Sequence, residues 1–232
     1  LFRNFTIGGT GGVYRVHTGP GKRSGIPSTD EVFDPTEIPG LNENTWFLRW
    51  GVLAKYDYRD DRNGASAGGV YGVQWHKYSD RDRGEFNFRQ LEGELQQFIP
   101  YFNKTRVIAL RAMAVLSFTD DGQRVPMYAQ PILGGNDYLR GFQRQRFYDD
   151  NAILATVEHR WQASEGVEPA IFVDAGKVTA NRSDLDFSDL DWSVGFGVRL
   201  RIKSAVVMRI DVAASDEGVR FMWTFNDIFR IR

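Results

Sequence analysis

The stretch DWSVGFGVRLRI, residues 191–202, has the clearest alternation of side chains in this sequence. Apolar residues occupy every second position from Trp192 to Ile202, and serine, glycine and arginine lie between them. Because successive side chains of a β-strand point to opposite faces, the stretch predicts a strand with one apolar and one polar face. Such a strand is long enough to cross a bilayer, which takes about 9–11 tilted residues.

The same period of two recurs along the chain and predicts ten strands, because no helical period of comparable length competes with it. The predicted strands cover residues 4–18, 46–58, 69–78, 86–100, 105–118, 151–161, 169–178 and 191–202, and a last hairpin around 206–212 and 219–226. In that hairpin the predicted apolar face holds Val206, Met208, Ile210, Val212, Phe221, Trp223 and Phe225, and Asn226 belongs to the polar face.

The connections between these segments alternate between short turns and longer polar loops. Residues 19–44 and 119–150 are the longest, whereas PYFNKT and IKSA are short. Short turns at one end and long loops at the other are typical of an outer-membrane barrel. We therefore predict one domain, residues 1–232, folded as an all-β, antiparallel transmembrane β-barrel of about ten strands.

A soluble β-sandwich or lipocalin-like barrel is the alternative, and composition alone leaves it open. The mean hydropathy of −0.40 does not decide, since lipid-facing and lumen-facing residues average out in a membrane strand. A soluble barrel, however, would have to enclose the six tryptophans in a small lumen. Aromatic residues at strand ends also suit membrane-interface girdles, namely Trp46, Tyr58, Tyr78, Trp161 and Trp192.

Several functional classes find no support in the sequence. Lys and Arg total 29 against 30 Asp and Glu, so no excess of basic charge indicates a nucleic-acid partner. The chain has no cysteine, and its three histidines stand at unrelated spacings, so we expect no metal site. No nucleophile elbow or phosphate-binding loop is present. We expect neither catalytic residues nor a cofactor, and therefore no enzyme.

The most specific chemistry lies in the loop stretch GGNDYLRGFQRQRF, residues 134–147. Arg140 in this loop, Glu158 on the next strand and Asp174 in FVDAG carry opposite charges. A loop that folded back into the barrel could bring them together. The alternative is that Arg140 lies in solvent and Asp174 is one of many lumen carboxylates.

Three motifs together resemble the BamA/TamA-type assembly and secretion barrels of bacterial outer membranes, the bacterial surface antigen barrels. The first is Leu139-Arg140-Gly141-Phe142, preceded by Gly134-Gly135 and followed by RFYDDNAILATVEHRW. The second is FVDAG at 172–176, and the third is YDYRD at 56–60. Their order and spacing agree from about residue 45 to the end of the chain.

This resemblance implies that the loop 119–150 is directed into the lumen, where Arg140 pairs with Asp174 and lies near Glu158. It also implies that residues 219–229 form the terminal strand by which such barrels are recognised and closed, with Phe221, Trp223, Phe225 and Phe229 as its aromatic positions. The chain continues past Phe229 with Arg230, Ile231 and Arg232, which departs from the family pattern. Family barrels have about sixteen strands, so we expect this chain to be the C-terminal part of a larger barrel, with a smaller self-contained barrel as the alternative.

The resulting functional hypothesis is an outer-membrane β-barrel that assembles, inserts or translocates proteins, with the Arg-Gly-Phe loop latched in the lumen. Its expected partners are membrane lipid, a client or passenger protein, and periplasmic domains or accessory proteins. The alternative hypothesis is a passive pore, or the membrane anchor of a passenger domain absent from this chain.

Overall fold

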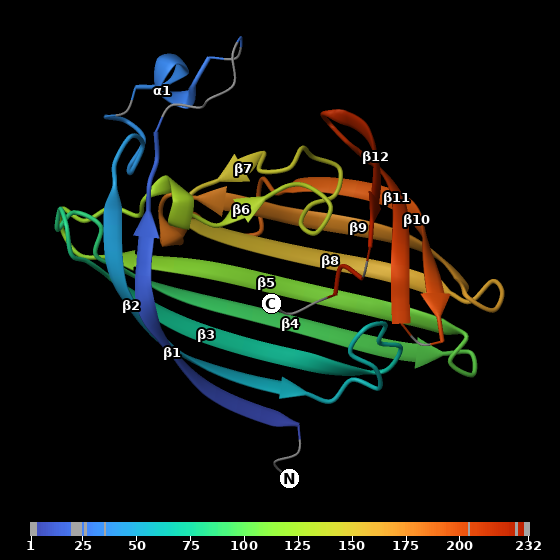
Figure 1. The fold of residues 1–232 in the computed structure, drawn as a ribbon. Helices are drawn as coiled ribbons and strands as arrows, with labels where there is room; N and C mark the ends of the chain where they lie inside the picture. The colour runs from blue at the N-terminus through green and yellow to red at the C-terminus, as the bar shows by residue number, and fades with distance from the viewer. Residues whose placement is uncertain are drawn as a thin grey trace.

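The computed structural model describes residues 4–19, 25, 27–34, 36–203, 205–225 and 227–229. Its main feature is a single antiparallel sheet of ten strands in chain order, β1-β2-β3-β4-β5-β8-β9-β10-β11-β12. The sheet curves into a trough (Figure 1). Within the described residues β1 and β12 are its two edges and pair with one neighbour each, so the sheet is not closed.

The predicted strands are confirmed, with ends shifted by a few residues. The sheet consists of β1 (Phe5–Val16), β2 (Thr45–Asp57), β3 (Gly68–Asp80), β4 (Phe88–Tyr101), β5 (Arg106–Thr119), β8 (Asn151–Trp161), β9 (Val167–Thr179), β10 (Asp191–Ile202), β11 (Ala205–Ser215) and β12 (Gly218–Thr224). The shared register of each neighbouring pair keeps the two faces of the sheet continuous from strand to strand.

The long connections contain short elements that the period of two did not predict. A single helical turn, α1 (Thr29–Val32), lies in the 19–44 connection, and residues 20–24, 26 and 35 of that connection are outside the described residues. The 119–150 connection contains the 3-10 turn η1 (Met127–Ala129) and a small hairpin of β6 (Ile132–Leu133) and β7 (Phe147–Tyr148). A second 3-10 turn, η2 (Arg182–Asp184), follows β9.

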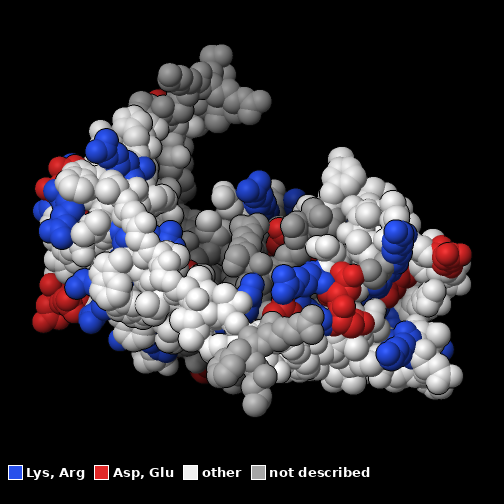
Figure 2. All heavy atoms as spheres, turned by 60° about the horizontal axis from the view of Figure 1, so that its bottom comes forward, with Lys and Arg blue, Asp and Glu red and all other residues white. Residues whose placement is uncertain are grey.

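The two faces of the sheet differ sharply in chemistry. The outer, convex face exposes apolar and aromatic side chains, among them Trp50, Leu95, Ile171, Trp192 and Phe196. The inner face carries the polar set, and many of its arginines and carboxylates are fully buried. Figure 2 shows charged side chains crowded at the left end of the molecule and again across its right half, with a largely uncharged area between them. This is the pattern of a barrel with an apolar band outside and a polar interior.

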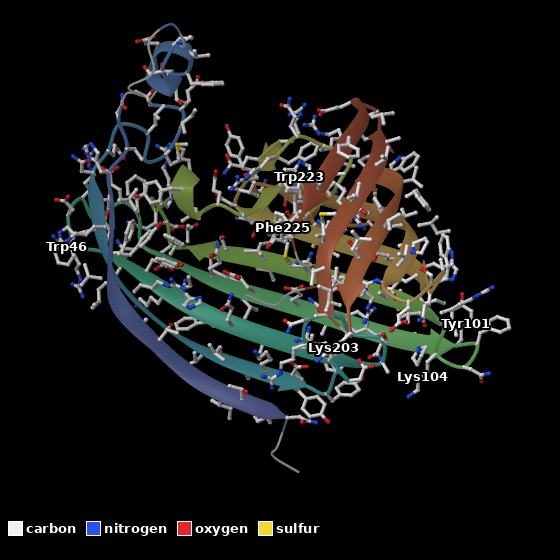
Figure 3. The ribbon with its side chains drawn as sticks, turned by 45° about the vertical axis from the view of Figure 1, so that its right-hand side comes forward. Trp46, Tyr101, Lys104, Lys203, Trp223 and Phe225 are labelled. Atoms are coloured by element: carbon white, nitrogen blue, oxygen red, sulfur yellow. The ribbon has the colours of Figure 1, made fainter. Side chains whose placement is uncertain are left out.

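The two ends of the sheet also differ. The long connections leave the end that holds Trp46, and Figure 3 shows Tyr101 and Lys104 at the opposite end, which we call the short-turn end. No helix within the described ranges is long and apolar enough to cross a membrane.

One predicted girdle residue is wrong. Tyr78 is only 9% exposed and packs on the inner face, with its ring 4.4 Å from that of Phe88 and 6.1 Å from that of Phe47. The reason is strand parity, because Tyr78 lies two residues after His76, which is also buried on the inner face. Its position near the end of a strand suggested a girdle, but its parity places it inside.

The predicted face of Val206 is also wrong. The pairing of β10 with β11 shifts between Leu200 and Arg201, where Leu200 lies opposite Met208 but Arg201 lies opposite Val206. Val207 is thus an extra residue in β11, a β-bulge that reverses the alternation before it. Val206 is consequently buried, whereas Val207 is 37% exposed.

Candidate functional site

The loop between β5 and β8 turns into the concave side of the sheet and packs there. Leu139 and Phe142 are fully buried in one cluster with Leu133, Ala152 and Leu154. The ring of Phe142 meets that of Phe147 edge to face at 5.0 Å. This apolar contact anchors the tip of the loop on β8, since burying such side chains is worth about 1.5–3 kcal/mol each.

The loop backbone needs its glycines at three places. Gly134 and Gly135 have φ of 98° and 101°, and a Cβ on Gly134 would lie 2.2 Å from the carbonyl oxygen of Gln143. A Cβ on Gly141 would lie 2.5 Å from the Cβ of Ser193 and 2.9 Å from that of Ser215. The loop therefore approaches β10 and β11 too closely for any side chain at Gly141.

Arg140 lies between these contacts, with no exposed side-chain surface. Its Nε and Nη2 atoms donate to the two carboxylate oxygens of Asp174 at 2.7 and 2.9 Å, and its backbone amide donates to the same carboxylate at 3.1 Å. Its Nη1 donates to Glu158 at 2.8 Å. The guanidinium also lies over the ring of Phe172, 3.3 Å from the centroid. A bidentate fork of this kind defines both the position and the orientation of the loop.

Arg140 belongs to a larger inner-face ion cluster of eight buried side chains, namely Arg140, Arg160, Arg199, Arg209, Glu158, Asp174, Asp211 and Asp227. Glu158 accepts from Arg140, from Arg160 at 2.7 Å and from Arg199 at 2.6 Å. Four cations face four anions, so the cluster has no formal net charge. Such balance matters, because an unpaired buried charge is far more costly than a paired one.

Only three members of this cluster, Arg140, Glu158 and Asp174, are predicted from the sequence. Arg160, Arg199, Arg209 and Asp211 could have been found from parity, because each lies on the predicted polar face of its strand. Asp227 could not be found in this way, since it lies beyond the last strand. Asp211 joins the set through Arg199 at 2.6 Å and Arg209 at 2.9 Å.

The C-terminal residues depart from the expected terminal strand. Phe221, Trp223 and Phe225 lie on the outer side and are more than half exposed, but β12 ends at Thr224. Phe229 is 2% exposed and packs inside, with its ring 5.3 Å from that of Phe98. Asp227 accounts for the turn, because its carboxylate accepts from both terminal nitrogens of Arg160 at 3.0 and 3.1 Å. Asn226 and Arg230 to Arg232 lie outside the described residues.

The YDYRD motif, at the short-turn end of the sheet, contacts the C-terminal segment 227–229. Arg59 forms a bidentate pair with Asp57 at 2.8 and 2.9 Å, and its Nη1 donates to the carbonyl oxygen of Phe229 at 3.3 Å. The YDYRD motif therefore contacts the segment 227–229, which Arg160 of the inner-face ion cluster holds through Asp227.

The rest of the interior is polar and partly open. A cavity of about 570 Å³ lies beside the loop and is bordered by Gln90, Glu92, Met113 and Arg144. At the mouth of this region, η1 covers an aromatic cluster, and burial there raises the pKa of Tyr128 to about 12. In the part of the chain that the structure describes, no group of His, Asp or Glu side chains could hold a metal ion.

A curved antiparallel sheet with an apolar outer face, a charged interior and an inward loop defines a transmembrane β-barrel protein. The chain belongs to the Omp85 superfamily, because the model of the Omp85 superfamily domain matches residues 15–226. The family predicted from the loop, FVDAG and YDYRD motifs is thereby confirmed.

Two solved structures share the fold at low sequence identity. BamA from Haemophilus ducreyi lacking POTRA domains 1–3 is 16% identical with a TM-score of 0.65, over 80% of this chain and 42% of that one. CdiB from Acinetobacter baumannii is 13% identical with a TM-score of 0.52, over 78% of this chain and 32% of that one. The chain therefore spans less than half the length of either structure. No curated protein matches it in sequence.

Proposed function

We propose that this chain is the membrane barrel, or a part of it, of a bacterial outer-membrane protein that assembles, inserts or translocates client proteins and has no enzymatic activity. Membership of the Omp85 superfamily supports this class of function. The expected partners are membrane lipid and an unfolded client, with periplasmic domains like the POTRA domains named for the BamA structure.

The observation that carries the proposal is the docked loop. Arg140 is tied to two strands through Asp174 and Glu158, although it lies inside a 31-residue connection between β5 and β8, from residue 120 to residue 150. A passive pore gains nothing from burying four arginines at its wall, whereas a latch that defines the shape of the interior would require them. We propose that Gly134, Gly135, Leu139, Arg140, Gly141 and Phe142 form this latch, with Glu158 and Asp174 as its partners.

We also propose that the ten strands belong to a larger barrel. Two observations support this: β1 and β12 each have one free edge within the described residues, and the chain covers 42% of the BamA structure. Free sheet edges are costly in a bilayer, because their backbone groups have no water to bind there. Further strands would satisfy them and would enlarge the lumen around the loop.

Substitution of Arg140 by alanine tests the latch in the whole barrel that contains this chain. The protein is reconstituted in liposomes, and an unfolded outer-membrane barrel protein is added as the client. The rate at which the client becomes resistant to protease is then measured. We expect the rate to fall about tenfold, which corresponds to about 1.4 kcal/mol. Arg144→Ala is the matched control, because Arg144 is an exposed arginine of the same loop.

Planar-bilayer recordings on the same variants separate the two hypotheses. An assembly barrel should be closed most of the time and should open more often after Arg140→Ala. Steady, large conductance in the unsubstituted protein, together with no effect of either variant on the client, would favour the passive pore or the anchor.

A further inference from the structure

Three cations, two on the outer face of the sheet and one in the β9–β10 connection, form a row near the end from which the long connections leave. Lys77 on β3 lies directly opposite Arg89 on β4, and Arg89 lies opposite Phe118 on β5. The guanidinium of Arg182 covers the ring of Phe118 at 4.3 Å. Neighbours across strands have Cβ atoms about 4.5–5.5 Å apart, so Lys77, Arg89 and Phe118 adjoin one another, and Arg182 reaches them through the ring of Phe118.

Three cations of this row face one paired carboxylate, that of Asp120. Asp120 pairs with Arg89 at 2.7 Å, and Arg182 donates to the carbonyl oxygen of Ser117 at 2.7 Å. Lys77 is exposed and makes no side-chain hydrogen bond or ion pair within the described residues. Like charges directly opposite each other destabilise a sheet. An anion bound across Lys77, Arg89 and Arg182 would remove that repulsion.

An apolar groove lies on the same face, closer to the middle of the strands. Its volume is about 470 Å³, and small residues make it hollow, chiefly Gly93, Ala112, Ala114, Ala155 and Ala175. Phe187 and Leu190 border it from the β9–β10 connection. Lys177 holds this connection against the sheet, since its ammonium group donates to Asp186 at 2.6 Å and to the carbonyl oxygen of Ser188 at 3.1 Å.

The distance between the row of cations and the groove allows one ligand to contact both, with a charged group at the row and an apolar group in the groove. Gly93 lies four residues along β4 from Arg89, which corresponds to about 13 Å at roughly 3.3 Å per residue. Trp50 lies opposite Lys77 and marks the depth at which tryptophan favours the boundary between headgroups and acyl chains.

We propose that this face binds an anionic lipid with a phosphate monoester headgroup, with the phosphate at Lys77, Arg89 and Arg182 and an acyl chain in the groove. Arginine suits the phosphate, because its planar fork can donate to two phosphate oxygens at once. The groove suits an acyl chain, because its lining is almost entirely apolar. The inference rests on the proposed membrane-spanning role of the sheet.

The test uses the whole barrel that contains this chain, in detergent micelles, and native mass spectrometry with dioleoyl phosphatidic acid as the probe. Dioleoyl phosphatidylcholine tests the headgroup, and inorganic phosphate tests whether the anion alone suffices. The charge variant combines Lys77→Gln, Arg89→Gln and Arg182→Gln. Its matched control combines Lys104→Gln, Arg106→Gln and Lys203→Gln, three cations near the short-turn end, where Figure 3 shows Lys104 and Lys203. Ala114→Phe fills the groove without removing a charge.

We expect the charge variant to bind phosphatidic acid about tenfold more weakly, or about 1.4 kcal/mol, and the control to bind within about twofold of the unsubstituted chain. Ala114→Phe should weaken binding as well, and phosphatidylcholine should bind poorly. Equal losses in both triple variants would overturn the site. Displacement of the lipid by an equal concentration of inorganic phosphate, or undiminished binding by Ala114→Phe, would overturn the role of the groove.

A gel-shift on heating confirms that each variant is folded before it is compared. Insertion into liposomes is then measured by protease protection. A whole barrel that does not insert contradicts the proposed membrane role, whereas a barrel that inserts but does not prefer phosphatidic acid contradicts the lipid site alone.

Discussion

At the scale of single residues, Arg140 and Gly141 perform complementary tasks in the docked loop. Arg140 supplies five donors, and its side chain uses three of its nitrogens on Asp174 and Glu158. Gly141 has no side chain, so its backbone can approach β11 closely. Its carbonyl oxygen accepts a hydrogen bond from the hydroxyl of Ser215 at 3.0 Å. Removing one partner of a buried pair costs about 3–5 kcal/mol.

Gly141→Ala should therefore displace the loop although it removes no charge. The new methyl group would lie 2.5 Å from the Cβ of Ser193, and both atoms belong to rigid backbone-proximal positions. We expect a loss of about 1–3 kcal/mol in the free energy of unfolding, as for other overpacked sites. Urea titration of the refolded barrel, followed by tryptophan fluorescence, measures it.

Gly12→Ala is the control for this change, because a Cβ at Gly12 meets nothing within 4 Å. It should leave the stability unchanged or raise it slightly, since glycine weakens a strand by about 0.5–1 kcal/mol relative to alanine. If both variants had the same stability as the unsubstituted chain, the close approach at Gly141 would have no energetic role.

At the scale of elements, the inner face of β8 to β11 is a single charged surface that the loop and the C-terminal segment share. Asp174 and Glu158 bind the loop, whereas Arg160 binds Asp227 of the segment 227–229. Glu158 contacts Arg140 and Arg160 at the same time, at 2.8 and 2.7 Å. The loop and the C-terminal segment are thus coupled through one carboxylate.

Asp227→Asn should release the C-terminal segment while leaving the sheet intact. The change removes the charge that faces Arg160, whose side chain is fully buried. We expect a loss of about 3–5 kcal/mol at most, because Arg160 keeps Glu158 as a partner. Faster amide hydrogen exchange over residues 227–229, measured by mass spectrometry, should accompany it.

Asp186→Asn is the matched control, because Asp186 is 61% exposed in its pair with Lys177. Exposed pairs contribute about 0–1 kcal/mol, so this variant should keep the exchange of residues 227–229 unchanged. Slow exchange of the segment in Asp227→Asn would mean that Phe229 alone holds it inside.

At the scale of the whole molecule, the question is how the two edges of the sheet are arranged. Figure 1 shows β1 and β12 on opposite sides of the trough. A self-contained ten-stranded barrel would require these strands to pair, and its lumen would hold little beyond side chains, since about eight strands are already just filled. We expect the docked loop to need more space than such a barrel offers.

Engineered disulfides test whether β1 and β12 pair with each other. The chain has no cysteine, so only the introduced cysteines can form a disulfide. Gly11→Cys on β1, combined in turn with Val219→Cys, Phe221→Cys or Trp223→Cys on β12, should not cross-link in the refolded chain. The control pair, Ala112→Cys with Ala155→Cys, should cross-link, since these residues face each other across β5 and β8. An efficient β1 to β12 cross-link would establish the smaller closed barrel.

The sequence by itself determined the ten strands and the side of nearly every side chain, because alternation is a local property of the strand backbone. Tyr78 lies two residues after His76, so the alternation alone assigns both side chains to the same, inner face. Only the tertiary structure decided what depends on neighbouring strands and on the free chain ends. The bulge at Val207 reverses Val206, and the stagger of the strands gathers four arginines around Glu158, Asp174 and Asp211. The segment 227–229 turns inward because the carboxylate of Asp227 pairs with the buried guanidinium of Arg160, which lies 67 residues earlier in the chain.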